Sequence, residues 1–163
     1  MTHYDYIILG AGSAGCVLAN RLSENSSNKV LLLEAGGSDR RFFVQMPIGY
    51  GKTYHQKEVN WMYMTEPSPY ADNKPSYWPR GKVLGGSSSI NAMVYVRGNP
   101  RDFDEWSEAG NPGWSYEEVL PYFKKMESWQ NGADNYRGGD GPLNVSEVSS
   151  QLHPLCNNFL AAA

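Results

Sequence analysis

The fold of this chain is decided close to its N-terminus, by residues 4–22, YDYIILGAGSAGCVLANRL. An apolar run rich in β-forming residues ends at Gly10, as expected of a strand that is buried on both faces of a parallel sheet. Glycines at positions 10, 12 and 15 follow, and then apolar residues at helical spacing. A second apolar run, residues 30–33, leads directly into Glu34. The sequence therefore predicts a strand, a turn, a helix and a second strand, which begin a Rossmann-like α/β domain.

Each glycine of this motif has a physical role in binding a dinucleotide. Gly10 permits the tight turn, Gly12 lets a pyrophosphate approach the backbone, and Gly15 lets the helix pack close to the strand. The helix N-terminus offers N–H groups to the phosphates. Glu34 can accept hydrogen bonds from both ribose hydroxyls, and its charge disfavours a 2′-phosphate. A plain βαβ unit is the alternative without a ligand. The pattern favours NAD or FAD over NADP and leaves the choice between NAD and FAD open.

The composition excludes several other classes of protein. The chain has 163 residues, of which 19% are charged and 13% aromatic, and its formal charge is -3. Neither a disordered tail nor a nucleic-acid-binding surface is expected from these values. Cys16 and Cys156 form neither a disulfide framework nor a zinc motif, so no metal site is expected. Cys16 falls inside the expected helix, where we predict a small buried thiol.

The sequence contains no candidate membrane span and no signal peptide. No apolar run approaches the roughly 18 residues that a span requires, and the N-terminus lacks a basic segment followed by an apolar one. These features predict a cytoplasmic protein without a transmembrane segment.

The sequence after Glu34 differs from the pattern expected of a nicotinamide dehydrogenase, which would continue with a regular helix and strand. Residues 37–80 are irregular and contain prolines at positions 47, 67, 69, 75 and 79. Within them, residues 59–65 alternate bulky β-forming side chains and predict one strand. Because the long loop is also rich in aromatic residues, it favours a folded lid over a flexible linker.

A second unusual stretch covers residues 81–98, GKVLGGSSSINAMVYVRG. Two adjacent glycines and three serines between apolar residues predict a backbone that wraps closely around a polar ligand. A serine-rich surface turn is the alternative, but such turns rarely continue into residues such as Ile90, Met93 and Val94. The stretch therefore indicates a second part of the binding site.

This stretch, extended to Asp104, resembles the first signature of the glucose–methanol–choline (GMC) oxidoreductases. Residues 5–15 and 34–37 are similar to the FAD-binding start of the same family. The resemblance covers nearly the whole chain and is greatest for bacterial choline-dehydrogenase-like and alcohol-dehydrogenase members. Two motifs in the expected order and spacing imply that the cofactor is FAD rather than NAD.

The resemblance also implies which residues contact FAD. The pyrophosphate would be held by Gly10, Gly12, Ser13, Ala14 and Gly15. Glu34 would hold the adenosine ribose, while Val83 with Gly86 and Ser87 would contact the diphosphate–ribityl region. The backbone N–H groups of residues 91–94 would lie beside the isoalloxazine ring. The expected cofactor-binding set is Gly10, Gly12, Ser13, Ala14, Gly15, Glu34, Ala35, Gly81, Val83, Gly86, Ser87, Asn91, Ala92, Met93 and Val94.

The mode of FAD attachment also follows from the resemblance. Some family members attach the flavin covalently through a histidine that immediately precedes the position of Asn91. In this chain that position is Ile90, which cannot form such a bond. Non-covalent FAD is therefore expected.

The remaining residues predict the start of a second domain. Residues 101–106 predict a short helix, and Ser115 with Glu118 predicts a capping box. Pro121 is expected to end that helix and to begin another, which runs to Glu127. A strand is expected from Leu143 to Val145, and a last helix over 155–163.

The expected organisation has four parts. These are a dinucleotide-binding βαβ unit (1–36), an FAD-covering lid (37–80), a flavin-binding signature segment (81–104), and the helices and incomplete start of an α+β substrate domain (105–163). The chain therefore resembles the truncated N-terminal part of a GMC enzyme.

The reaction implied by the resemblance is oxidation of a small-molecule alcohol to an aldehyde, with hydride transfer to N5 of FAD. The family's catalytic histidine lies in the C-terminal part, and none of His3, His55 and His153 matches its motif, so no catalytic residue is expected here. The chain alone is expected to be inactive. The electron acceptor, oxygen or a quinone, stays open. A lyase-type flavoprotein of the family and a non-catalytic flavin-binding fragment are the alternatives.

Overall fold

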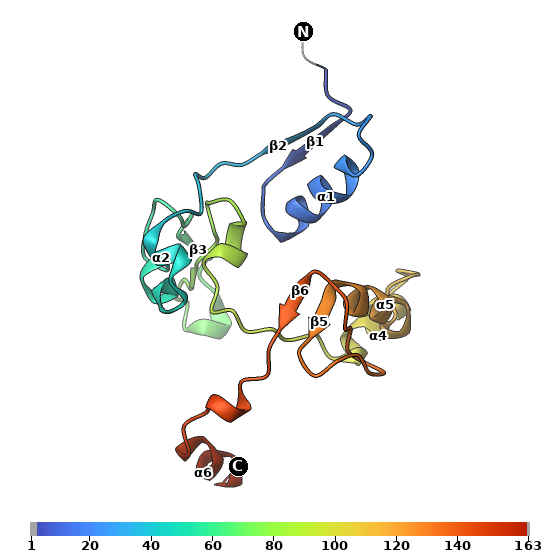
Figure 1. The fold of residues 1–163 in the computed structure, drawn as a ribbon. Coiled ribbons are helices and arrows are strands. Elements are labelled where there is room, and N and C mark those ends of the chain that lie inside the picture. The colour runs from blue at the N-terminus through green and yellow to red at the C-terminus, as the bar shows by residue number, and fades with distance from the viewer. Residues whose placement is uncertain (1–2, 163) are drawn as a thin grey trace. The chain divides into compact units, whose positions relative to one another are not determined.

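A computed structural model describes residues 3–162 (Figure 1). The chain divides into two units, Met1–Val94 and Tyr95–Ala163. The division falls inside residues 81–104, the segment that the sequence analysis treats as one part.

The first unit begins with the βαβ motif expected from the sequence. Strand β1 covers Tyr6–Leu9, helix α1 covers Ser13–Ser23, and strand β2 covers Val30–Leu33. The two strands pair in parallel, with Tyr6 opposite Val30 and Leu9 opposite Leu33. A parallel pair requires a crossover connection, and α1 provides it (Figure 1). The predicted α/β arrangement of this region is confirmed.

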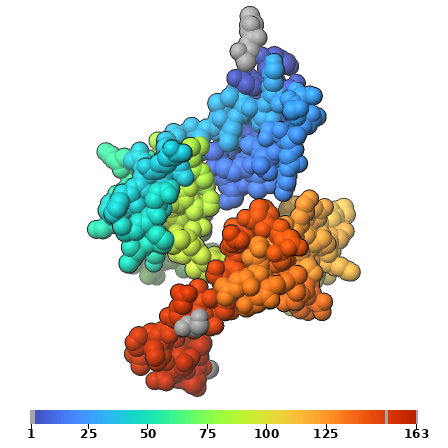
Figure 2. Space-filling view, in the orientation of Figure 1, coloured from blue at the N-terminus to red at the C-terminus, as the bar shows by residue number. Residues whose placement is uncertain are grey.

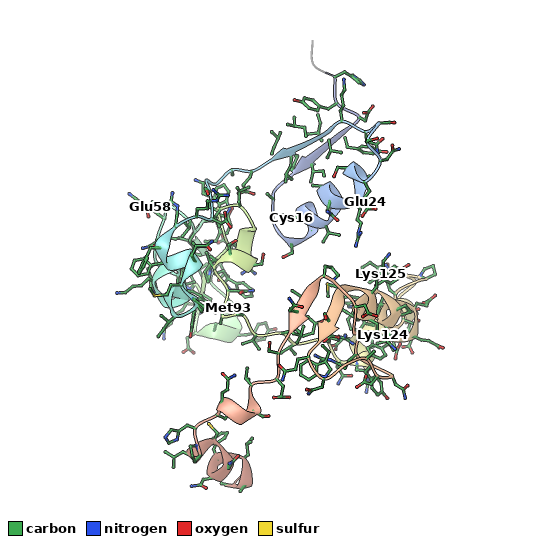
Figure 3. All side chains as sticks on the ribbon, in the orientation of Figure 1. Cys16, Glu24, Glu58, Met93, Lys124 and Lys125 are labelled. Carbon is green, nitrogen blue, oxygen red and sulfur yellow. The ribbon has the colours of Figure 1, made fainter. Side chains whose placement is uncertain are left out.

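The βαβ motif is only partly covered. Ile8 is the buried residue of β1, whereas the side chains of Ile7 and Leu9 are exposed, Leu9 by 81%. In α1 the buried residue is Gly15. The prediction of a buried Cys16 is wrong, because the helix packs one face on two strands and Cys16, labelled in Figure 3, lies outside that face and is exposed.

Short elements follow β2 and form the region predicted as an irregular lid. They are α2 (Phe42–Gln45), the 3₁₀ turn η1 (Pro47–Gly49), α3 (Tyr50–Thr53), β3 (Tyr63–Met64), η2 (Pro69–Ala71) and β4 (Tyr77–Trp78). Strands β3 and β4 are antiparallel. The strand predicted over 59–65 is therefore shorter than expected. Met62 adopts a left-handed backbone conformation, with φ 54°, which interrupts an extended strand.

The signature segment packs against this region. It contains the 3₁₀ turn η3 (Gly86–Ser89). Val59, Val83 and Ile90 form a buried cluster with Val44 packed beside it. Gly37 forms a parallel bridge with Val83. In Figure 2 the cyan residues of the lid accordingly lie against the yellow-green residues of the signature segment.

The second unit contains two helices and a small sheet. Helix α4 covers Pro100–Glu108 and starts with a capping box between Asn99 and Asp102, whereas α5 covers Tyr116–Met126 with the predicted box between Ser115 and Glu118. Strands β5 (Glu127–Trp129) and β6 (Leu143–Val145) pair in parallel. Phe103 lies at the centre of the aromatic contacts between α4 and α5. The predicted helix near 101–106 and strand at 143–145 are confirmed.

Pro121 does not end a helix as predicted. Helix α5 runs through it without interruption. A proline at this position removes one hydrogen bond, to the carbonyl four residues earlier. That carbonyl belongs to Glu117, and both residues are exposed, so water can replace the missing donor.

The chain continues through the turn η4 (Ser149–Gln151) to helix α6 (Leu155–Ala162). The predicted last helix is present, and Ala163 lies outside the described residues. Among residues 3–162, no helix combines the length and the apolar character needed to cross a membrane.

Candidate functional site

The first unit contains a cavity at the carboxyl ends of β1 and β2. Its volume is about 610 Å³, within the usual range of ligand sites. Ligands of open α/β sheets bind at this end of the strands. The lining residues are Leu9, Gly10, Gly12, Leu33, Glu34, Ala35, Trp61, Tyr63, Arg80, Gly81, Gly86 and Ser87.

The glycine turn shapes one side of this cavity. Gly10 has a φ of +91°, which permits the sharp turn after β1. A Cβ atom on Gly15 would lie 1.9 Å from the carbonyl oxygen of Gly10, so the close packing of helix on turn requires glycine there. A Cβ atom on Gly12 would meet only the Cα atom of Gly86, at 4.0 Å. The surrounding protein therefore leaves free space in front of Gly12.

The N-terminus of α1 carries the positive end of a helix dipole. Gly12 is its N-cap and has no side chain to accept from the first amides, and the first turn contains no acidic residue. The first N–H groups of a helix have no partner within it. This end of α1 can therefore bind an anion.

Glu34 is held in a fixed orientation at the end of β2. Its Oε2 atom accepts a hydrogen bond from the N–H of Ala11 at 2.8 Å, and its Oε1 atom accepts from the N–H of Gly36 at 2.8 Å. A carboxylate offers about four lone-pair positions. Glu34 can therefore still accept hydrogen bonds from a ligand while the two amides fix its position.

The signature segment closes the cavity opposite the glycine turn. The N–H of Gly85 donates to the carbonyl oxygen of Ala11 at 2.8 Å. A Cβ atom on Gly86 would lie 2.8 Å from the Cα atom of Gly12, so the two backbones are in close contact. The Ser87 hydroxyl accepts from the N–H of Gly81 at 3.1 Å. The two sequence motifs thus meet through main-chain contacts.

The structure brings seven of the expected cofactor-binding residues to this cavity, namely Gly10, Gly12, Glu34, Ala35, Gly81, Gly86 and Ser87. Ser13, Ala14 and Gly15 belong to the first turn of α1, and Val83 is fully buried in the core cluster. Asn91 and Met93 line a smaller cavity of about 160 Å³, beside residues of α2 and η1. Asn91 also lines a third cavity, of about 430 Å³. Ala92 and Val94 line none of the three.

Sequence reasoning missed five lining residues, which are Leu9, Leu33, Trp61, Tyr63 and Arg80. Trp61 and Tyr63 stack with ring centroids 5.8 Å apart, and the ammonium of Lys82 lies 4.6 Å from the centroid of the Trp61 ring. Their alternation with Met62 was visible as a strand pattern. Because the pattern does not say which face lines a cavity, it gave no site assignment.

The described histidines lie outside this cavity. The ring of His55 stacks on Tyr77 at 5.8 Å, and Nδ1 of His153 accepts from the N–H of Leu155 at 3.2 Å. No histidine lines the cavities found in residues 3–94. The site can therefore bind and orient a ligand, but these histidines do not supply a base to it.

A model of a known protein family matches almost the whole chain. Residues 4–163 match the family model described as GMC oxidoreductase. This chain therefore belongs to the GMC oxidoreductase family.

Curated relatives are similar over almost the whole chain. The chain is 54% identical to an oxygen-dependent choline dehydrogenase of Photobacterium profundum, over 99% of this chain and 28% of that protein. It is 49% identical to the mitochondrial choline dehydrogenase of Mus musculus, over 98% of this chain and 28% of that protein. The chain thus spans little more than a quarter of the length of these relatives.

Solved structures show the same fold. The pyridoxine 4-oxidase of Mesorbium loti matches with a TM-score of 0.89 and 36% identity, over 98% of this chain and 31% of that one. A formate oxidase matches with a TM-score of 0.83 and 31% identity, over 99% of this chain and 30% of that one.

Proposed function

We propose that this chain is the FAD-binding part of an oxidoreductase that acts on CH–OH donors. The observation that carries the proposal is the cavity in which the glycine turn, the fixed carboxylate of Glu34 and the turn at Gly86 meet. In this proposal residues 1–36 bind the adenosine half of FAD, residues 37–80 cover the cofactor, residues 81–104 contact the flavin half, and residues 105–163 begin a substrate domain.

The residues around the cavity fit FAD in shape and charge. The free space in front of Gly12 would accept the pyrophosphate, next to the positive end of α1. Glu34, oriented by two amides, would accept from the ribose hydroxyls. Similar solved structures include an FAD-dependent oxidoreductase of Chaetomium thermophilum and a formate oxidase of Aspergillus oryzae with FAD modification. The fit of the cavity residues and the FAD-containing names of these similar proteins both support FAD as the ligand.

We further propose that the FAD is bound without a covalent link. Ile90, which stands immediately before Asn91, has an unreactive side chain and is 4% exposed in the core cluster. Acid precipitation of the FAD-loaded chain is expected to leave the yellow colour in the supernatant. Flavin that pellets with the protein would contradict this proposal.

The substrate that we propose is a small-molecule alcohol, in line with the choline dehydrogenases among the relatives. When bound, FAD would supply the acceptor for the hydride of the alcohol carbon. The chain's own residues would bind and orient the cofactor, and the base that takes the hydroxyl proton would lie outside residues 1–163. Oxygen and a quinone both remain candidate electron acceptors, and the cytoplasmic location remains a prediction from the sequence.

Two measurements test this function. First, the 163-residue chain should retain FAD through gel filtration and quench its fluorescence. Second, a chimaera should be made in which this chain replaces the matching segment of the Photobacterium profundum choline dehydrogenase, to which it is 54% identical. The chimaera should oxidise primary alcohols, and its flavin should bleach when alcohol is added without oxygen.

The controls separate the alternatives. The 163-residue chain alone should show no alcohol oxidation in a dye-coupled assay. Turnover by that chain would place a base within it, with His55 the first residue to mutate. Failure of the chain to bind FAD would overturn the proposal.

A further inference from the structure

Asn60 is a buried polar side chain with several hydrogen bonds in the first unit. It lies between α3 and β3, and it is 2% exposed. A buried amide is costly unless its donors and acceptors are paired. The partners of this amide therefore show what the residue holds in place.

The carbonyl oxygen of the Asn60 side chain accepts hydrogen bonds from two stretches of chain that form the cavity wall. The Oδ1 atom accepts from the N–H of Arg80 at 3.0 Å and from the N–H of Met62 at 2.9 Å. Arg80 is itself a lining residue, and Met62 lies between Trp61 and Tyr63, which also line the cavity. One oxygen atom thus sets the spacing between two separate stretches of the cavity wall.

The amide nitrogen of Asn60 is bound on the lid side. The Nδ2 atom donates to the carbonyl oxygen of Tyr54 at 2.9 Å and to the hydroxyl of Tyr77 at 3.2 Å. The Tyr77 hydroxyl in turn donates to the carbonyl oxygen of Tyr54. Because Nδ2 faces oxygen acceptors and Oδ1 faces N–H donors, only one orientation of the amide satisfies this set.

Main-chain hydrogen bonds connect the residues that Asn60 holds to the signature segment. The N–H of Trp61 donates to the carbonyl oxygen of Arg80 at 2.8 Å, and Asn60 itself forms an antiparallel bridge with Gly81. A Cβ atom on Gly81 would lie 2.1 Å from the carbonyl oxygen of Gly86, so those backbones are in direct contact. A shift of Arg80 and Gly81 would therefore displace Gly86 and Ser87.

The backbone of Met62 gives a second, independent sign of constraint. A left-handed conformation costs a non-glycine residue of order 1–3 kcal/mol unless the surroundings hold it. Met62 has this conformation, with φ 54°, and its N–H is bound by Asn60 Oδ1. The bond therefore maintains the strained residue that turns Trp61 and Tyr63 toward the cavity.

We propose that Asn60 is a positioning residue for the cofactor site, an inference that rests on the proposed binding of FAD. It touches no cofactor atom. It acts through the N–H groups of Met62 and Arg80, and so fixes the aromatic wall and the arginine–glycine wall at the same time. Loss of the Oδ1 acceptor should weaken FAD binding and change the surroundings of the bound flavin, whereas loss of the Nδ2 donor should loosen mainly the lid.

The experiment compares three variants of this chain within the chimaera described above. Asn60→Ala removes donor and acceptor. Tyr77→Phe removes one acceptor of Nδ2 and leaves both hydrogen bonds to Oδ1 in place, so it tests the lid side alone. Thr53→Val is the matched control, because Thr53 is fully buried in the same region and loses only its local bond to the carbonyl oxygen of Tyr50. The readouts are the FAD dissociation constant from fluorescence quenching, the visible spectrum of bound flavin, and hydrogen exchange at the amides of Met62 and Arg80.

Asn60→Ala should raise the FAD dissociation constant about tenfold or more, since two hydrogen bonds to the cavity wall are lost. It should also shift the flavin spectrum and speed exchange at both amides. Tyr77→Phe should stay within about threefold of the wild-type affinity and keep the two amides protected, and Thr53→Val should leave affinity and spectrum unchanged. If Asn60→Ala does not fold, Asn60→Ser takes its place, because its shorter side chain keeps a hydroxyl but not the Oδ1 contacts with Met62 and Arg80, and the same losses are expected.

Three results would overturn the inference. These are unchanged FAD affinity in Asn60→Ala, equal losses in Asn60→Ala and Thr53→Val, and loss of affinity in Tyr77→Phe while the Met62 and Arg80 amides stay protected. In each case the wild-type chain still binds FAD, so the proposed function stands. A wild-type chain that binds no FAD would remove the proposed function and this inference together.

Discussion

The two units of the chain satisfy their buried polar groups in opposite ways. In the first unit the central group is neutral, the amide of Asn60, and most of its partners are main-chain atoms. In the second unit the central group is charged. Glu127 is fully buried at the start of β5 and forms ion pairs with Arg97 and Arg137.

The two kinds of buried group hold their units together at different energetic cost. Burying a carboxylate is expensive and is offset only when its partners stay in place. The carboxylate of Glu127 is met by two guanidinium groups and by the N–H of Gly138 at 3.3 Å, and the guanidinium of Arg137 lies 4.2 Å from the centroid of the Trp129 ring. This cluster joins β5 to the segments on either side of it. An amide holds main-chain segments at a lower desolvation cost, which suits the walls of a ligand cavity.

Removal of the buried charge in the second unit should have the greatest effect on stability. Glu127→Ala should lower the free energy of unfolding of the second unit by about 3–5 kcal/mol, because two arginines lose their partner. The change is measured as the urea midpoint for unfolding of residues 127–129, which pulsed hydrogen exchange reports within the whole chain. Glu117→Ala, at an exposed glutamate in the first turn of α5, is the matched control. A loss below about 1 kcal/mol in Glu127→Ala would show that the charge cluster does not hold the unit.

A pair of glycine variants should separate folding from binding in the first unit. Gly15→Ala places a Cβ atom 1.9 Å from the Gly10 carbonyl oxygen and should lower the stability of the chain, by about 1–3 kcal/mol as for other overpacked sites. Gly12→Ala meets no protein atom closer than 4.0 Å, so it should melt like the wild type. It should nevertheless weaken FAD binding, because the methyl group occupies ligand space. Thermal melts without FAD and FAD titrations make the comparison, and full FAD loading of Gly12→Ala would assign the turn a structural role only.

The carboxylate of Glu34 shares a feature with each of the two buried groups. It is charged, like Glu127, but it lies at the cavity whose walls Asn60 holds. Glu34→Ala should weaken FAD binding by about 1–3 kcal/mol through loss of charge-assisted hydrogen bonds. Glu34→Gln keeps the shape and part of the acceptor capacity and should lose less. Equilibrium titration with FAD measures both, with Glu24→Ala on the exposed end of α1 as the control. Unchanged affinity in Glu34→Ala would remove this residue from the site.

The smallest expected effect concerns acidic groups on the surface of the second unit. The Ser115 hydroxyl and N–H hold the pKa of Glu118 below its usual 4.5, and the N–H groups of Tyr136 and Arg137 hold the pKa of Asp134 below its usual 3.8. Both groups therefore stabilise the fold above their usual pKa values, and this contribution is lost as the pH falls through the lowered ones. Melting temperatures between pH 6 and 2 should decline less in Glu118→Gln and Asp134→Asn, and identical pH profiles would contradict the assignment.

The sequence was sufficient wherever the determinants are local. The β1–α1–β2 motif follows from apolar runs and glycine spacing, and the capping box at Ser115 follows from four consecutive residues. Pro121 was misjudged because the cost of one lost bond depends on exposure, which the sequence does not show. Strand β5 was missed because it continues directly from α5 and its partner lies at residues 143–145.

The cavity shows the same division between local and distant determinants. Its glycines and Glu34 belong to motifs whose chemistry is visible in the chain order. Arg80 and the pair of Trp61 and Tyr63 became lining residues only through pairing across the lid, and Asn60 gave no sequence signal because a single asparagine in a loop is ordinary.

The partly covered βαβ motif has a consequence for handling this polypeptide. A ladder of two strands has two open rims, and each rim presents unpaired N–H and C=O groups to the solvent. The residues on these rims, Tyr6–Leu9 and Val30–Leu33, carry no charge and no proline to discourage a further strand from joining. Purified alone, the 163-residue chain should therefore self-associate in a concentration-dependent way, by recruiting β-strands from its own copies.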